Sequence, residues 1–232
     1  MNKLGLKTGF SELNEINHGF CGGELITIAG RPGVGKTDFV LNIAKNILLN
    51  QNKPVAIFSL ETRILQLYSK MICLHSGISE RKLERGDLTK GEQIIFDKSA
   101  AIINKVKILI DDSAQLFPLD INIRSIQFKR DNPDLALIII DYFQLINVKG
   151  IENSLPEEQF AYAAKSLKDL ALNLCVPILV ISMLSRGNEI NYKPDLSQLG
   201  SAISLEKYSD KIILLHRPEN NSKKWLFVKM SG

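Results

Sequence analysis

The stretch from Gly30 to Thr37 has the residue types and the spacing of a phosphate-binding loop. It fits the pattern G-x-x-x-x-G-K-[ST] with the residues Gly30, Arg31, Pro32, Gly33, Val34, Gly35, Lys36 and Thr37. Glycines let the backbone bend closely enough to aim its N–H groups at phosphate oxygens, and the start of a helix adds a positive dipole end. In such loops the lysine reaches the β- and γ-phosphates and the threonine hydroxyl binds Mg²⁺. A glycine-rich turn with a chance lysine is the plainer alternative, but the strand before and the helix after favour a nucleoside triphosphate site.

Two carboxylates follow other apolar runs and could complete this chemistry. Asp141 ends the run Leu137–Ile140, where it can act as a magnesium residue or cap the next turn. Glu61 follows the run Val55–Leu60 and can accept a proton from an attacking water. The same glutamate could instead be favoured by the dipole of a following helix. Spacing alone leaves both interpretations of Glu61 open.

Short apolar runs alternate with helical patterns along the chain, and these elements must position the candidate site. The predicted strands are Glu24–Ala29, Val55–Leu60, Val106–Ile110, Leu135–Ile140, Pro177–Ser182, Lys211–His216 and Trp225–Lys229. The predicted helices are Thr37–Leu49, Thr62–His75, Leu119–Lys129 and Glu157–Leu174. Strands without strict alternation are typical of a sheet covered on both faces. We therefore expect an α/β fold whose mostly parallel central sheet carries helices on both faces, with the last two strands as an antiparallel edge hairpin.

Composition limits the possible classes of protein. The 232 residues suit one domain, residues 1–232, and 45% of them are hydrophobic. The apolar runs are too short to span a bilayer and the first residues lack a secretory h-region, so we expect no membrane association. Three widely spaced cysteines without metal-ligand spacing indicate reduced thiols and a cytoplasmic protein. The net charge of +4 is compatible with nucleic acid but decides little.

A set of motifs in a fixed order carries a family resemblance. The set consists of Thr8–Leu13, Gly19-Phe20, Gly23–Ile26, the stretch Ala29–Thr37, Phe58–Glu61, Ile140–Leu145, Ser166–Lys168, Val176-Pro177 and Leu184–Arg186. With these motifs the chain closely resembles the C-terminal motor domain of DnaB-type replicative DNA helicases from about Leu6 to Lys229. The resemblance implies a RecA-like P-loop ATPase that uses ATP and Mg²⁺ and assembles into a hexameric ring around single-stranded DNA. It also implies Glu61 as the catalytic base and Asp141 as the Walker B magnesium residue.

The resemblance extends to partners and to the limits of the domain. It implies phosphate and metal contacts from Lys36 and Thr37, and a helicase loader or primase as a possible protein partner. The family's N-terminal collar domain has no counterpart in these 232 residues. Loops facing the ring channel would bind DNA phosphates, and here they are Leu184–Pro194, with Arg186 and Lys193, and Gln198–Lys207. These loops carry few cations, so an ordinary solvated surface is an equal alternative.

Several positions depart from the family pattern. Met183 occupies the place of a glutamine that senses the γ-phosphate, and a thioether cannot donate a hydrogen bond to phosphate. Gly200-Ser201 replaces an Arg-Glu pair, and Met230-Ser231 occupies the position of an arginine finger, although Lys229 matches the neighbouring inter-subunit lysine. An arginine finger can contribute several powers of ten in rate. The departures predict retained binding and impaired hydrolysis.

Two functions therefore remain open. In the first, the chain is a helicase motor that couples ATP hydrolysis to translocation along single-stranded DNA and duplex unwinding in replication. In the second, it is a hydrolysis-poor paralogue that binds nucleotide and regulates or joins a helicase or recombination assembly. A KaiC- or RadA-like ATPase is a third possibility, which the stretches Phe58–Glu61 and Ile140–Leu145 make less favoured.

Overall fold

The chain folds around one seven-stranded sheet in the residues that the structure, a computed structural model, describes: 5–148, 155–185, 194–216 and 226–231. The strand order is β3-β2-β4-β5-β1-β6-β7. The strands are β1 Leu25–Gly30, β2 Val55–Ser59, β3 Ile108–Asp111, β4 Leu137–Asp141, β5 Ile178–Met183, β6 Lys211–His216 and β7 Leu226–Ser231. The first six run parallel and β7 pairs antiparallel with β6, which confirms the predicted sheet and its edge hairpin.

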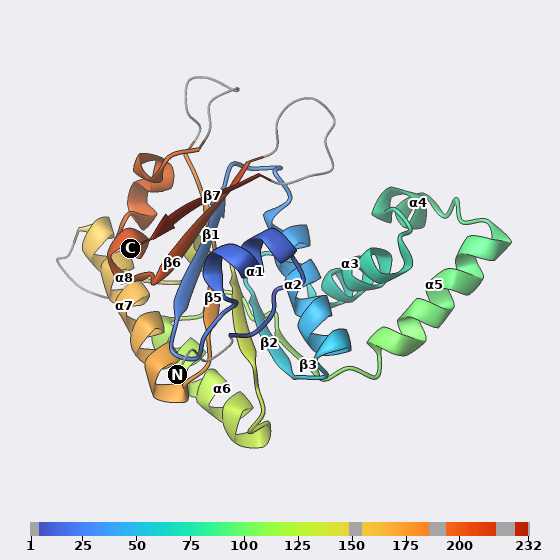
Figure 1. Cartoon of the computed structure of the whole chain (residues 1–232), viewed down its shortest axis with the longest axis horizontal. Coiled ribbons are helices and arrows are strands. Elements are labelled where there is room, and N and C mark those ends of the chain that lie inside the picture. Colours follow the sequence, from blue (N-terminus) through green and yellow to red (C-terminus); the bar gives the residue numbers. More distant parts are fainter. Residues whose placement is uncertain (1–4, 149–154, 186–193, 217–225, 232) are drawn as a thin grey trace.

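Helices cover both faces of this sheet (Figure 1). Helices α1, α2 and α3 pack on one face with part of α5, whereas α6, α7 and α8 pack on the other. The α-helices are α1 Ser11–Asn17, α2 Lys36–Asn50, α3 Ile64–Ser76, α4 Glu80–Arg85, α5 Lys90–Ile103, α6 Pro118–Asp131, α7 Pro156–Leu174 and α8 Ser204–Tyr208, and the 3₁₀ helices are η1 Phe143–Leu145 and η2 Leu196–Ala202. Among the described residues, every helix is too short or too polar to serve as a transmembrane span.

The double cover explains why the strands show no alternation in the sequence. In β1, Ile26 and Ile28 join the core beside α2 and α3, whereas Leu25 joins the core beside α6 and α7. In β2, Ile57 faces the first core and Phe58 the second. Side chains point alternately to the two faces of a strand, but here both faces are dry, so both sets are apolar.

Topology brings the carboxyl ends of several strands to one edge. Strand β5 lies between β1 and β4, with Met183 in register with Gly30. On the other side of β4, Ser59 of β2 is in register with Asp141. The loops that follow β1, β2 and β4 consequently open at the same edge, although they lie far apart in sequence. Ligands of open parallel sheets bind outside this edge.

Three helices, α3, α4 and α5, follow β2 and precede β3 in the chain. They form an arm that projects from one side of the sheet (Figure 1). The sequence-based prediction contained α3 but missed α4 and α5. Helix α5 begins with a capping box, in which Thr89 accepts from the Glu92 N–H and Glu92 accepts from the Thr89 N–H. The T-x-x-E pattern is readable in the sequence and could have revealed this helix.

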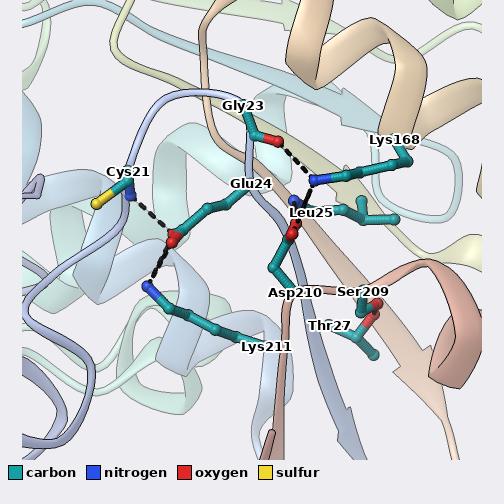
Figure 2. A network of polar contacts seen from close by, with 9 residues as sticks. All are labelled: Cys21, Gly23, Glu24, Leu25, Thr27, Lys168, Ser209, Asp210 and Lys211. Carbon is teal, nitrogen blue, oxygen red and sulfur yellow. Dashed lines mark hydrogen bonds and ion pairs between the residues drawn. The ribbon is translucent and has the colours of Figure 1, made fainter. Parts of the chain in front are cut away.

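Ion pairs and hydrogen bonds fasten the opposite edge of the sheet (Figure 2). The Lys168 ammonium donates to Asp210 Oδ2 at 2.7 Å and to the Gly23 carbonyl at 2.9 Å, joining α7 to the segments before β1 and β6. Asp210 Oδ2 also accepts from the Leu25 N–H at 2.7 Å. Beside this group, Lys211 pairs with Glu24. The start of β1, which leads into the candidate loop, is thereby held from two sides.

We predict that Asp210→Ala lowers the free energy of unfolding by about 1.5–3 kcal/mol, because it leaves a largely buried ammonium and a backbone N–H short of an acceptor. Asp210→Asn should cost less, since its amide oxygen can still accept from Leu25. Urea denaturation measures both. Lys82→Gln is the matched control, because the Lys82 side chain is more exposed than that of Lys168 and its pair with Glu92 is worth up to about 1 kcal/mol. Equal losses in Asp210→Ala and Lys82→Gln would contradict this account.

Candidate nucleotide-binding site

The glycine-bearing loop connects β1 directly to α2. Strand β1 ends at Gly30 and α2 begins at Lys36, so the predicted strand, loop and helix are all present. Gly33 and Gly35 have φ of 77° and 88°, in the left-handed region that disfavours residues with a Cβ. At Gly30 a Cβ would lie 2.9 Å from Val34 Cγ1, so space also requires glycine there. The three glycines thus serve the backbone path that aims the loop at a ligand.

The Lys36 side chain is buried inside this loop. Its ammonium donates to the carbonyl oxygens of Gly30 at 2.9 Å and Arg31 at 3.0 Å. Burial lowers the pKa of Lys36 from its ordinary value, and the negative charges of Asp141 and Glu61 oppose this shift only in part. The ammonium is therefore poorly solvated, a setting in which a phosphate oxygen is a favourable partner.

Thr37 and Asp141 meet although 104 positions separate them. The Thr37 hydroxyl donates to Asp141 Oδ2 at 2.9 Å. Asp141 is only 3% exposed at the end of β4, and burial raises its pKa to about 6. The Glu61 charge adds to this rise, whereas Thr37 and Lys36 oppose it. The positive groups around this buried carboxylate thus compensate the cost of its burial only in part.

The Thr37–Asp141 pair has the donor chemistry for Mg²⁺. Mg²⁺ prefers oxygen ligands and usually combines one or two protein oxygens with substrate phosphates and waters. Among the described residues, no group of three or more His, Cys, Asp or Glu side chains could hold a metal ion by itself. A hydroxyl and a carboxylate beside a phosphate loop fit this mode of binding, in which the ion shares its shell with the nucleotide.

Glu61 lies in the bend between β2 and α3, outside the helix. Helix α3 begins only at Ile64, so the interpretation of Glu61 as a residue of the first helical turn is not supported. Its charge contributes to the raised pKa of Asp141, and it adds to the effect of burial on the pKa of Tyr142. It lines the same cavity as Lys36. A carboxylate in this place can accept a proton from water near the terminal phosphate.

These side chains surround one cavity of about 370 Å³ beyond the ends of β1 and β4. Its lining residues are Pro32, Gly33, Gly35, Lys36, Thr37, Asp38, Glu61, Lys70, Asp141, Tyr142, Ile181 and Met183. Sequence reasoning missed Asp38 and Lys70. Asp38 directly follows the motif and could have been included, whereas Lys70 lies in the middle of α3 without any motif. Only the packing of α3 against α2 brings Lys70 to this cavity.

Met183 borders the cavity at the end of β5, between the loop and Asp141. The neighbouring Gln144 does not replace the missing polar side chain. Its amide donates to the Ser182 hydroxyl and to the Met183 carbonyl, both at 3.0 Å, and accepts from the Met183 N–H at 3.3 Å. Gln144 is thus committed to holding the end of β5, and an apolar thioether remains at the cavity wall.

The other predicted residues belong to later segments of the chain. Arg186 and Lys193 fall outside the described residues. Lys229 lies on β7, where it is in register with Ile213 of β6. Gly200 lies in η2 with a φ of 55°.

A G-x-x-x-x-G-K-T loop after the first strand of a doubly covered parallel sheet defines a P-loop domain of the RecA-like class. Residues 5–228 match the family described as DnaB-like helicase C terminal domain. The chain is 35% identical over 221 residues to the replicative DNA helicase DnaB of Geobacillus stearothermophilus, a match that covers 94% of the chain and 48% of that relative. The replicative DNA helicase DnaB of Buchnera aphidicola subsp. Baizongia pistaciae is 37% identical over 218 residues, covering 93% of the chain and 47% of the relative.

Two solved structures agree with this assignment. One, described as an ATPase domain, superposes with a TM-score of 0.87 at 26% identity, covering 98% of this chain and 87% of that one. A DnaB-like replicative helicase, described with its interactions with primase, gives a TM-score of 0.88 at 27% identity and covers 98% and 59%. The chain belongs to the DnaB-like helicase C-terminal domain family. It spans about half the length of the curated relatives that it matches.

We predict that Asp141→Asn stabilises the nucleotide-free protein at pH 7.5, by up to about 3 kcal/mol. The folded pKa of about 6 lies above the ordinary value of 3.8, so the folded state binds more protons between these values. Stability is therefore lost as the pH rises from about 4 to about 6, and the gain from asparagine should vanish below pH 4. Thermal unfolding between pH 4 and pH 7.5 measures the difference in stability between the two proteins.

The exposed Asp97 provides the control, because Asp97→Asn should leave the stability curve nearly unchanged. Asparagine can still accept from Thr37, so this hydrogen bond need not be lost. An equal or lower stability of Asp141→Asn at pH 7.5 would show that the carboxylate is not strained by burial.

Proposed function

We propose that this chain is the ATP-binding motor domain of a replicative DNA helicase, and that residues 1–232 form a single RecA-like ATPase domain. It would couple ATP hydrolysis to translocation along single-stranded DNA and to duplex unwinding in DNA replication. The supporting observation is the cavity that gathers Lys36, Thr37, Glu61 and Asp141 in a chain of this family. The protein would act in the cytoplasm, as expected from the sequence.

In this proposal each cavity residue has one task. Backbone N–H groups within Gly30–Thr37, all but Pro32 having one, bind the phosphates, and Lys36 exchanges its loop carbonyls for β- and γ-phosphate oxygens. Thr37 and Asp141 would hold Mg²⁺, which would neutralise charge on the phosphates. Glu61 orients the attacking water and accepts its proton. Tyr142 and Ile181 close the cavity wall.

The partners follow from the relatives. One neighbour is described with its interactions with primase, and several relatives are named replicative DNA helicases. We therefore propose self-association into a hexameric ring, single-stranded DNA as the track, and a primase or helicase loader as protein partner. Arg186 and Lys193 would contact DNA phosphates, and Lys229 would approach the nucleotide of a neighbouring subunit.

Met183 favours a second candidate, a nucleotide-binding subunit that hydrolyses ATP poorly. Its thioether borders the cavity where the resemblance implies a polar sensor, and Gln144 is occupied elsewhere. Binding depends on the loop, whereas turnover depends on groups that contact the γ-phosphate in the transition state. Loss of such a group would leave ATP binding intact and reduce ATP turnover.

Lys36→Ala should remove detectable ATP binding, because in the proposed complex the ammonium contacts the phosphates. Far-UV circular dichroism should stay nearly unchanged, because without nucleotide the ammonium bonds only to carbonyls of the loop. Isothermal titration calorimetry with Mg²⁺-ATP measures the binding. Lys98→Ala, an exposed lysine of α5, is the control. Retained affinity in Lys36→Ala would contradict the assigned site.

ATP turnover stimulated by single-stranded DNA tests the motor function. We expect stimulation in the assembled protein, and no stimulation in a verified ring would contradict the proposal.

Met183→Gln combined with Met230→Arg distinguishes the two candidates. A hydrolysis-poor subunit should gain turnover, up to about a thousandfold if a working finger is restored. Ordinary turnover by the unaltered chain would exclude the second candidate.

A further inference from the structure

Lys70 places a second ammonium at the edge of the nucleotide cavity. It comes from the middle of α3 and lines the cavity together with Thr37 and Asp141. Its Nζ lies 2.8 Å from Glu80 Oε2 and 3.8 Å from Asp38 Oδ1. The Lys70 side chain is 27% exposed, so it is neither fully solvated nor locked in the core.

This ammonium lies at the boundary between two hollows. The phosphate cavity adjoins a larger one of about 620 Å³ between α2, α3 and α4, and both are lined by Asp38 and Lys70. Glu80 lines only the larger hollow. A lysine carries its charge on a flexible four-carbon stem. Lys70 can therefore turn from the side of Glu80 to the side of the phosphate loop.

The charges of the cavity favour such a turn when a triphosphate is bound. Among the described lining residues, the ammonium groups are Lys36 and Lys70, and the carboxylates are Asp38, Glu61 and Asp141. Burial lowers the pKa of Lys70, but Glu80, Asp38 and Glu84 together outweigh this and raise it, so the group is charged at neutral pH. The thioether of Met183 offers no charge to the terminal phosphate.

We propose that Lys70 recognises the γ-phosphate, exchanging its contact with Glu80 for a contact with the terminal phosphate when ATP is bound. The inference rests on the proposed nucleotide site and assigns a further residue to it. ADP offers no such oxygen, so Lys70 keeps Glu80 in the ADP complex. Because Glu80 begins α4, the exchange releases the start of α4 from α3 only in the ATP state.

The exchange predicts a specific change in nucleotide preference. Lys70→Gln should weaken binding of a non-hydrolysable ATP analogue roughly tenfold and leave ADP binding unchanged, because one charge-assisted contact is lost only with the triphosphate. Glu80→Gln should strengthen analogue binding relative to ADP, since it removes the competing carboxylate. Lys82→Gln, which removes another lysine–glutamate pair of the same arm, should change neither. Calorimetry with Mg²⁺ and each nucleotide gives the ratio.

Hydrogen exchange gives a readout that needs no turnover. Amides of α4 should exchange faster with the ATP analogue than with ADP, and Lys70→Gln should remove this difference. Lys70→Arg, which keeps the charge, should retain most of the preference for the triphosphate and so shows that a loss in Lys70→Gln is not misfolding.

The outcomes separate the two proposals. If the unaltered chain binds neither nucleotide, the proposed function is wrong. If it binds both and Lys70→Gln keeps the same preference, the inference on Lys70 is wrong and the nucleotide site stands. Equal weakening of both nucleotides, or a lowered preference in Glu80→Gln, would likewise overturn the exchange.

Discussion

The hydrogen bond between Thr37 and Asp141 is the contact on which the site depends. It joins the first turn of α2 to the end of β4, and it exists only because β5 separates β1 and β4 by a single strand in a parallel sheet. Parallel strands carry their following loops to one edge, so the phosphate loop and both carboxylates share a cavity without being close in sequence. The ion pairs of Lys168 and Lys211 at the other edge hold the start of β1 and β6 in this arrangement.

In the same arrangement, the burial of the Asp141 carboxylate costs electrostatic free energy. Burial raises the pKa of Asp141 to about 6, and the charge of Glu61 adds to this rise, whereas the Thr37 hydroxyl and the Lys36 and Lys70 ammonium groups offset it only in part. A carboxylate kept this way binds a divalent ion more readily than a solvated one with a low pKa, since the ion relieves the repulsion. The site is in this sense arranged for a ligand that brings positive charge together with phosphate.

The cavity separates the groups proposed for binding from those proposed for hydrolysis. The loop and its lysine depend on backbone geometry, which Gly33 and Gly35 preserve. Met183, by contrast, contributes nothing polar at the end of β5, and the amide of Gln144 serves the strand itself. Lys70 of the helical arm brings a second ammonium group to this cavity, whose wall is apolar at the end of β5.

Much of this protein could be predicted from its sequence. The spacing of Gly30, Gly35 and Lys36 determines a phosphate loop by local stereochemistry, and the ordered motifs identify the family, so loop, sheet and helices were confirmed within a few residues. The helices α4 and α5 were missed although Thr89 and Glu92 carry a capping signal.

Glu61 remained ambiguous because a carboxylate after a strand can cap a helix or face a ligand, and only the start of α3 at Ile64 separates these two interpretations. Lys70 could not be found at all, since its place at the cavity arises from α3 packing on α2. Local patterns determine elements and backbone turns, whereas the tertiary structure decides which side chains of distant elements share one desolvated space.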